Sequence, residues 1–224
     1  MAILTTRHPG RPKPSEIGAH DARSALIDSA RLCFSTHPYA KVTTRMLATQ
    51  AGVNAALIRY YFLNKEGLYQ QMLESVAALF QRKVMEYFEA SPSHPFEAIF
   101  RAHRAMASDS PDIPKLIFKE LAFDEGKSRK LVLDCVAKPN KAFMLALLQK
   151  FKGSQHDDLP TLREDFDPSI LLLSVLSMSL MPLLLQEAIA EVDGTTFNQE
   201  HIEKMIWQNT QMIQFGCLAK GEDT

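Results

Sequence analysis

Apolar residues recur at every third or fourth position through most of the chain, which is the spacing of one face of an α-helix. Between Lys65 and Glu89 this recurrence is nearly unbroken. The residues that carry it are Leu68, Met72, Val76, Leu79, Phe80, Val84 and Tyr87. No stretch shows the period-two alternation between hairpin turns that is typical of paired β-strands. The pattern therefore predicts an all-α protein.

Helix-breaking residues divide this pattern into segments. The first helix is predicted to run from about Asp21 to Ser35, and a long helix from Lys65 ends before Pro92 and Pro95. Five further helices are predicted at about residues 95–108, 111–124, 128–151, 167–190 and 197–219. The separators between them are short and rich in Ser, Pro, Asp and Gly, the residues that favour turns.

The stretch from Thr43 to Lys65 has the spacing of a helix-turn-helix. Thr43 precedes a helix-forming run, so its hydroxyl can accept a hydrogen bond from a free N–H group of the first turn. Ala48 is small enough for a second helix to cross closely, and Gly52 comes where the turn calls for a left-handed backbone. Asn54 is a favoured N-cap for the second helix. The sequence therefore predicts a second helix that begins at Asn54.

The second helix of this motif is predicted to be only about two turns long. Ile58 and Phe62, four residues apart, supply its buried stripe, and the small and polar residues between them face outward. This face suits a DNA major groove, with the predicted groove-facing residues being Asn54, Ala55, Ala56, Arg59, Tyr60 and Tyr61. The predicted phosphate contacts are Thr43, Thr44, Arg45 and Lys65. The alternative is a helix-glycine-helix corner of the kind that many all-helical proteins contain, but the full spacing favours DNA.

At these residues the chain resembles the TetR family of transcriptional regulators. The matching residues are Phe34, Thr43, Ala48, Ala51, Gly52, Val53, Phe62, Lys65 and Glu66, and they fall within about the first 70 residues. The chain departs from the family pattern at Arg59 (usually tyrosine), Asn54 (serine), Leu63 (often glycine) and Pro38 (glycine). Since proline cannot take positive φ, the first turn is expected to differ in detail.

Charge is distributed unevenly along the 224 residues. Residues 1–65 carry nine Lys or Arg against three acids, and the rest carries sixteen against twenty-three. A basic end on an acidic body fits one surface that faces phosphates. Three parts are therefore predicted: a flexible basic arm at 1–18, a helix-turn-helix domain at 19–66 and a ligand-binding and dimerisation domain at 67–224. The arm, with Arg7, Arg11 and Lys13, is either a disordered tail or a segment that enters the minor groove.

The segment from Ile170 to Leu185 is the most apolar part of the chain. At 16 residues, with three serines and Pro182, it is shorter than a typical bilayer span, so no membrane association is expected. A helix that is apolar all round should be buried on every side. The last predicted helix, at about 197–219, has apolar residues on one side only. Two such helices from each of two copies predict a four-helix interface of a homodimer. The alternative is that both helices belong to the core of a monomer.

In a dimer, the two second helices of the helix-turn-helix motifs, held about 34 Å apart, would match successive major grooves. The predicted DNA partner is therefore a palindromic operator in double-stranded DNA. Resemblance to the TetR family also implies a body-domain pocket for a small-molecule effector that weakens operator affinity. The candidate pocket residues are Phe100, His103, Met106, Phe118, Phe143, Met178 and Met181. Aromatic and methionine side chains are equally ordinary core filling.

No motif indicates catalysis. The chain lacks GxSxG, GxxxxGK[ST], GxGxxG after a strand and HExxH, and its seven histidines never pair at i,i+4. No catalytic residue, cofactor or metal is therefore predicted. Cys33, Cys135 and Cys217 form no CxxC pair and fit buried thiols in the cytoplasm, with redox sensing as the alternative. The predicted function is a dimeric, ligand-responsive repressor; a helical protein-interaction adaptor with a basic head and a helical-bundle enzyme are the competing classes.

Overall fold

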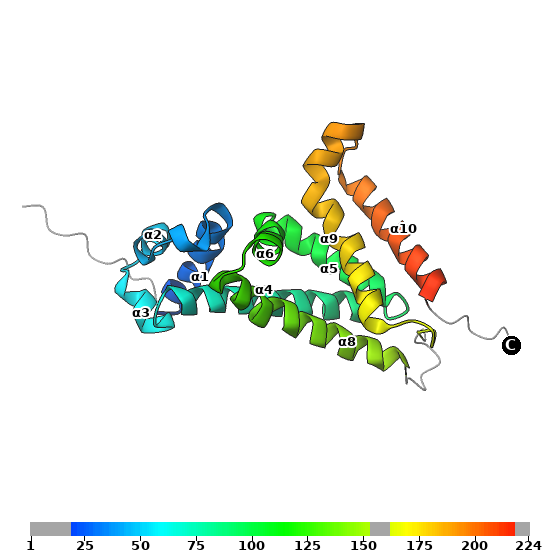
Figure 1. Ribbon diagram of the computed structural model, residues 1–224, viewed down its shortest axis with the longest axis horizontal. Coiled ribbons are helices and arrows are strands. Elements are labelled where there is room, and N and C mark those ends of the chain that lie inside the picture. Colours follow the sequence, from blue (N-terminus) through cyan, green and yellow to red (C-terminus); the bar gives the residue numbers. More distant parts are fainter. Residues whose placement is uncertain (1–18, 153–161, 218–224) are drawn as a thin grey trace, which may run out of the picture. The chain divides into compact units, whose positions relative to one another are not determined.

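The computed structural model describes residues 19–152 and 162–217, and within these ranges it contains helices and no β-strand (Figure 1). The all-α prediction is confirmed. The described residues form two compact units: an N-terminal unit that ends at Tyr69 and a C-terminal unit that begins at Gln70. The boundary falls inside the helix α4 (Lys65–Ala90). The predicted arm at 1–18 lies outside the described residues.

The N-terminal unit is built from three helices and the first turn of α4. Its elements are α1 (Ala19–Thr36), the short 3-10 helix η1 (Tyr39–Lys41), α2 (Thr44–Gln50) and α3 (Ala56–Phe62). Helix α1 packs against both α2 and α3. The buried hydroxyl of Ser29 donates to the carbonyl oxygen of Leu47 at 2.7 Å, so the one buried polar side chain of α1 that is described is satisfied by α2.

Three aromatic rings pack together next to the turn that connects α1 to η1. The rings of Phe34 and Tyr69 lie 4.5 Å apart, and Tyr39 lies 5.0 Å from Tyr69. Pro38, with φ of −56°, leads directly into η1 and places Tyr39 in this cluster. The proline thus enters a 3-10 turn with negative φ, as its ring requires.

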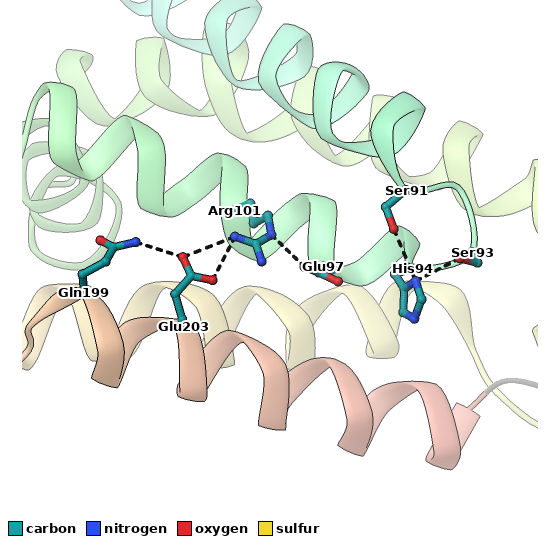
Figure 2. A network of polar contacts seen from close by, with 7 residues as sticks. All are labelled: Ser91, Ser93, His94, Glu97, Arg101, Gln199 and Glu203. Atoms are coloured by element: carbon teal, nitrogen blue, oxygen red, sulfur yellow. Dashed lines mark hydrogen bonds and ion pairs between the residues drawn. The ribbon is translucent and has the colours of Figure 1, made fainter.

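The C-terminal unit is a helical bundle. It contains the rest of α4, α5 (Pro95–Asp109), α6 (Asp112–Phe123), α7 (Lys127–Val132), the π-helical η2 (Leu133–Ala137), α8 (Lys138–Lys152), α9 (Pro168–Asp193) and α10 (Gln199–Cys217). Helix α5 packs against α9 and α10, while α6 and α8 also contact α9. Figure 2 shows a polar network that joins α5 to α10, in which Arg101 lies between Glu97, 2.7 Å away, and Glu203, 3.0 Å away.

One predicted helix, at about residues 128–151, is interrupted in the structure. A π-helical turn separates α7 from α8, and the N–H of Lys138 donates to the carbonyl of Leu133, five residues earlier. Pro139 explains the interruption, because it has no N–H for the carbonyl of Cys135 and its ring would clash with that carbonyl in a regular α-helix. The periodic pattern of apolar residues could not show this widening.

Helix α9 is continuous through Pro182. It begins after Asp167, whose carboxylate accepts from the N–H of Ser169 at 2.7 Å, and ends at Gly194 in a left-handed conformation. Proline at 182 leaves the carbonyl of Met178 without its usual helical partner. The amide nitrogen of Asn209, from α10, donates to that carbonyl at 3.5 Å, the outer limit of a hydrogen bond.

Candidate functional site

The turn between α2 and α3 has the predicted backbone. Thr43 accepts a hydrogen bond from the N–H of Met46 at 3.2 Å, which confirms it as the N-cap of α2. Gly52 has φ of +66°, the left-handed conformation that its position in the sequence predicted. The N–H of Val53 then donates to the carbonyl of Ala48 at 3.0 Å and fixes the corner. The two helices are therefore held at a set angle by backbone contacts.

Helix α3 begins two residues later than predicted. Its first residue is Ala56, and Ala55 takes the N-cap position without a side-chain cap. Asn54 nevertheless accepts a hydrogen bond from the N–H of Ala56 at 2.9 Å. The asparagine therefore satisfies a free donor of the first turn from one residue further out.

The two faces of α3 differ sharply in burial. Ile58 and Phe62 are buried, as their spacing predicted. The predicted groove-facing residues that are exposed are Asn54, Ala55, Ala56, Arg59 and Tyr60, and the predicted phosphate contacts that are exposed are Thr43, Thr44 and Arg45. Tyr61 is half-buried, and its ring meets that of Tyr60 edge to face at 4.8 Å. A small-residue surface flanked by a guanidinium and a phenol is thus open to solvent.

The connection from α3 to α4 is strained and tightly packed. Leu63, 80% exposed, has φ of 68° and ψ of −45°, and the N–H of Asn64 donates across it to Phe62. This is a γ-turn with positive φ at its centre, which is uncommon and costly for a branched side chain. Gly67 lies so close to Phe62 that a Cβ atom would overlap the carbonyl oxygen of that residue. The end of α3 is therefore pressed onto the start of α4.

The ammonium of Lys65, a predicted phosphate contact, is bound by backbone carbonyls of its own unit. It donates to the carbonyls of Tyr39, at 2.9 Å, and Val42, at 3.0 Å, and lies 4.2 Å from the centre of the Tyr39 ring. Burial lowers the pKa of Lys65 below its ordinary value. In this conformation the side chain links α4 to η1 within the protein.

A second candidate site lies wholly in the C-terminal unit. A cavity of about 530 Å³ is enclosed by side chains of α4, α5, α6, η2, α8 and α9. Three of the predicted pocket residues, His103, Met106 and Phe118, line it. The other four do not: Phe100 is buried in the core, Phe143 and Met178 pack against that core, and Met181 is exposed on α9.

His103 is the polar group inside this cavity. Its Nδ1 lies 2.8 Å from the hydroxyl of the buried Ser179 on α9, and its ring lies 4.5 Å from that of Phe80. Burial lowers the pKa of His103 to about 4, against a smaller opposing effect of a hydrogen bond to the backbone of Ile99. The imidazole is therefore neutral at pH 7, and the interior of the cavity carries no charge there.

Three polar residues of the cavity lining were not predicted. Asn140 is half-buried, whereas Lys141 and Ser169 are exposed. They come from the start of α8 and the start of α9, two segments far apart in the sequence. Helical spacing gave no sign of them, since exposed polar residues near a helix start are usually solvated.

Large apolar side chains are exposed on α9 and α10. They are Ile170, Leu173, Leu176, Met181, Leu185 and Val192 on α9, and Trp207, Met212 and Phe215 on α10. By length and composition Pro168–Val192 of α9 could cross a membrane, with a mean hydropathy of 2.0, although the core helix of a soluble protein can have the same length and composition. The helix has 26 residues and is longer than its 16-residue apolar segment, so helix length does not support the expectation of no membrane association. Leu171, Val175, Ser179 and Leu183 form a buried stripe, however, as in a helix of a packed bundle.

Comparisons with known proteins match both the N-terminal residues and the fold. Residues 26–72 match the family model of the bacterial regulatory proteins of the tetR family. No match to the chain was found among curated protein sequences.

Several solved structures share the fold. FadR of Bacillus subtilis in complex with stearoyl-CoA is 14% identical with a TM-score of 0.65, and the match covers 86% of this chain and 98% of that one. FadR of Bacillus halodurans, a fatty acid degradation regulator, is 14% identical with a TM-score of 0.64, covering 86% and 94%. HlyIIR, a hemolysin II transcriptional regulator, is 15% identical with a TM-score of 0.53, covering 85% and 98%. The α2–α3 geometry described above and the match at residues 26–72 show that the N-terminal unit carries a helix-turn-helix domain of the kind found in the bacterial regulatory proteins of the tetR family.

Proposed function

We propose that this regulator is a homodimer that binds a palindromic operator in double-stranded DNA and represses transcription until a small molecule enters its C-terminal cavity. The observation that carries the proposal is the division of α3 into a buried stripe of Ile58 and Phe62 and an exposed face around Arg59. A short, rigidly held helix that offers small residues and one guanidinium outward has the form of a major-groove reader.

The exposed residues divide into two roles. Asn54, Ala55, Ala56, Arg59, Tyr60 and Tyr61 are proposed to line the major groove, where Arg59 reaches a guanine edge. Thr43, Thr44 and Arg45, at the start of α2, are proposed to bind phosphates. The hydrogen bonds of Lys65 to Tyr39 and Val42 favour a structural role, in which the side chain holds η1 in place. They do not favour the predicted role of a phosphate contact.

The exposed apolar residues of α9 and α10 support the homodimer. Seven of the nine large apolar side chains exposed on these helices do not line the cavity, and they would stay in water if the described chain were alone. The same two helices of a second copy would cover them in an isologous four-helix interface. Two reading helices would then be available for half-sites one helical turn of DNA apart, about 34 Å.

The cavity supports effector control. Its size falls in the range of sites for small molecules, and its lining is mainly apolar. Val76 and Phe80 line it and belong to α4, the same continuous helix that begins at Lys65 beside the end of α3. An effector that binds one position of α4 more tightly than another would shift the population of DNA-competent molecules. Such a regulator acts in the cytoplasm, where the DNA is.

The first experiment identifies the operator sequence by selecting, from random duplex DNA, the fragments that the protein binds. With the selected operator, Arg59→Ala should lower specific affinity by about 1–3 kcal/mol and relax the preference at one base pair. Arg82→Ala is the matched control, because Arg82 is an exposed arginine of the C-terminal unit that pairs only at the surface with Glu86, at 3.4 Å. Fluorescence anisotropy at fixed salt measures both. Undiminished operator affinity of Arg59→Ala would remove Arg59 from the groove-facing set.

A helical protein-interaction adaptor is the competing proposal, since a basic end could also bind an acidic partner. Duplex selection distinguishes the two. Repeated recovery of one palindrome, with affinity that falls as salt rises, favours the regulator. Recovery of unrelated sequences with equal affinity would favour the adaptor.

A further inference from the structure

The cavity in the C-terminal unit has an apolar interior and a polar rim. Its deeper walls come mainly from aliphatic and aromatic side chains of α5, α6 and α9, among them Ile99, Ile117 and Val175. His103 is held by Ser179 and is neutral at pH 7, so this wall offers no charge to a ligand. No Asp or Glu is among the lining residues. A buried cationic group would therefore have no counter-charge, and an apolar chain would lose nothing by entering.

The rim adds donors and one positive charge. Asn140 accepts a hydrogen bond from the amide of Gln81 through its own carbonyl oxygen at 3.0 Å, which leaves its N–H groups for another acceptor. Lys141 follows directly and is exposed at the edge of the cavity. Ser169 brings a hydroxyl from the start of α9. The more exposed part of the cavity lining thus contains hydrogen-bond donors and one ammonium.

Lys141 differs from nearby lysines in having no ionic partner among the described residues. Lys138, one turn earlier on α8, pairs with Asp134 at 2.6 Å, and Lys115 pairs with Glu187 at 3.1 Å. An ammonium without a carboxylate partner beside an apolar cavity can bind an anion without first breaking an ion pair. The charge at the rim therefore selects for a negative group on the ligand.

We propose that the cavity binds an amphiphile made of one long apolar chain and one anionic head group, with the chain between α5, α6 and α9 and the head at Lys141, Asn140 and Ser169. The inference rests on the proposed effector role of this cavity and specifies its ligand class. A free long-chain carboxylate and a long-chain acyl thioester with a phosphate-bearing carrier share this chemistry. The structure of FadR with stearoyl-CoA shows that one protein of this fold holds such a molecule.

The geometry also separates this ligand class from two others. A long-chain alcohol would fill the interior but would gain only a neutral acceptor's hydrogen bond from Lys141, without the attraction between opposite charges. A long-chain quaternary ammonium would place a positive charge beside that lysine, where like charges repel. Affinity should therefore rank anionic above neutral above cationic for one chain length, and the ranking should depend on residue 141.

The test is direct binding to the full-length protein without DNA, by isothermal titration calorimetry below the micelle concentration of each probe. The probes are palmitate, palmitoyl-CoA, hexadecanol and hexadecyltrimethylammonium. Palmitate, palmitoyl-CoA or both should bind at least about tenfold more tightly than hexadecanol, and the cation should bind least. Binding of palmitate alone identifies a free carboxylate, and binding of palmitoyl-CoA alone identifies the thioester.

Variants at the rim test the role of the charge. Lys141→Gln should lower anionic affinity about tenfold and leave hexadecanol unchanged, and Lys141→Glu should bring the cation level with the anions or above them. Lys119→Gln is the matched control, because Lys119 is exposed on α6 and does not line the cavity. Equal binding of hexadecanol and palmitate, or anionic binding that ignores residue 141, overturns the inference.

The DNA-binding measurements keep this inference separate from the proposed function. A protein that binds its selected operator but none of the four probes refutes the ligand class and leaves the regulator intact. A protein that binds the anionic probes but no duplex refutes the regulator and leaves the cavity assignment standing. Calorimetry therefore tests the ligand class, and duplex selection tests the DNA-binding function, independently of each other.

Discussion

The two units of this protein differ in what they leave exposed. In the N-terminal unit, the large apolar side chains exposed among the described residues are Leu32, Tyr60 and Leu63, and the last two belong to α3 and its end. In the C-terminal unit, nine such side chains lie on α9 and α10 alone. The first unit exposes few large apolar side chains and carries the proposed DNA-binding face, whereas the second exposes an apolar surface that another protein surface could cover. Exposure thus separates a proposed DNA-binding face from a proposed protein interface.

The largest expected effect comes from placing a charge on the C-terminal face. Phe215→Glu should weaken the proposed homodimer by about 3–5 kcal/mol, because each copy would bury a carboxylate without a partner. Phe215 is 75% exposed in the single chain, so the monomer itself should fold normally. Sedimentation equilibrium measures the change. Leu32→Glu, at an exposed apolar residue of the other unit, should leave the mass unchanged, and equal loss in both variants would place the interface elsewhere.

A methyl group at Gly67 tests how tightly the N-terminal unit is packed. Gly67→Ala should destabilise it by about 3 kcal/mol, the upper end for overpacking, since the clash is with the backbone of Phe62. Urea unfolding followed by circular dichroism measures the loss. Gly216→Ala is the control, because a Cβ atom there meets nothing within 4 Å, and it should be neutral or slightly stabilising. Similar midpoints for the two variants would contradict the close contact.

Lys65 distinguishes internal support from DNA contact. Lys65→Met keeps much of the aliphatic stem and removes the charge, so the carbonyls of Tyr39 and Val42 lose their donor. Stability should fall by about 2 kcal/mol. The slope of log K against log salt for DNA should stay unchanged, whereas loss of a phosphate contact would reduce it by about 0.9. Lys41→Met, at an exposed lysine of the same unit, is the control for stability.

The smallest expected effect is an increase in the stability of the N-terminal unit. Leu63→Gly should stabilise the N-terminal unit by about 0.5–1 kcal/mol, because glycine adopts positive φ without a Cβ clash and no burial is lost. Thermal unfolding of the variant beside wild type measures it. A lower midpoint would show that the exposed leucine makes a contact that outweighs the backbone strain.

The helix-turn-helix could be predicted from the sequence because its roles are local. Thr43, Gly52, Ile58 and Phe62 each act within one turn of their neighbours, and the structure places them as their spacing indicated. Lys65 could not be placed in this way, since it donates to carbonyls 26 and 23 residues away. Residue type and helical phase do not determine a contact over that separation.

The cavity was predicted only in part for a related reason. Periodicity tells which residues of a helix face inward, but not whether they meet another side chain or an empty space. Phe100 faces inward and packs in the core, whereas His103, one turn later on the same helix, lines the cavity. The π-helical turn before Pro139, which contributes Val136 and Ala137 to the lining, had no signal in the apolar pattern.

A weak contact between the amide of Asn209 and the carbonyl of Met178 joins the two helices that carry the exposed apolar residues. In the interior of α9, the carbonyl four residues before Pro182 lacks its usual helical donor, so the amide of Asn209 has a free acceptor at this axial position. Sliding by a single turn would move the amide about 5.4 Å and leave both groups unmatched. Pro182, which would ordinarily weaken a helix, here frees a carbonyl of α9 that accepts a hydrogen bond from Asn209 of α10. Replacement of either residue would therefore remove one polar contact that favours the observed alignment of the outward side chains of α9 and α10.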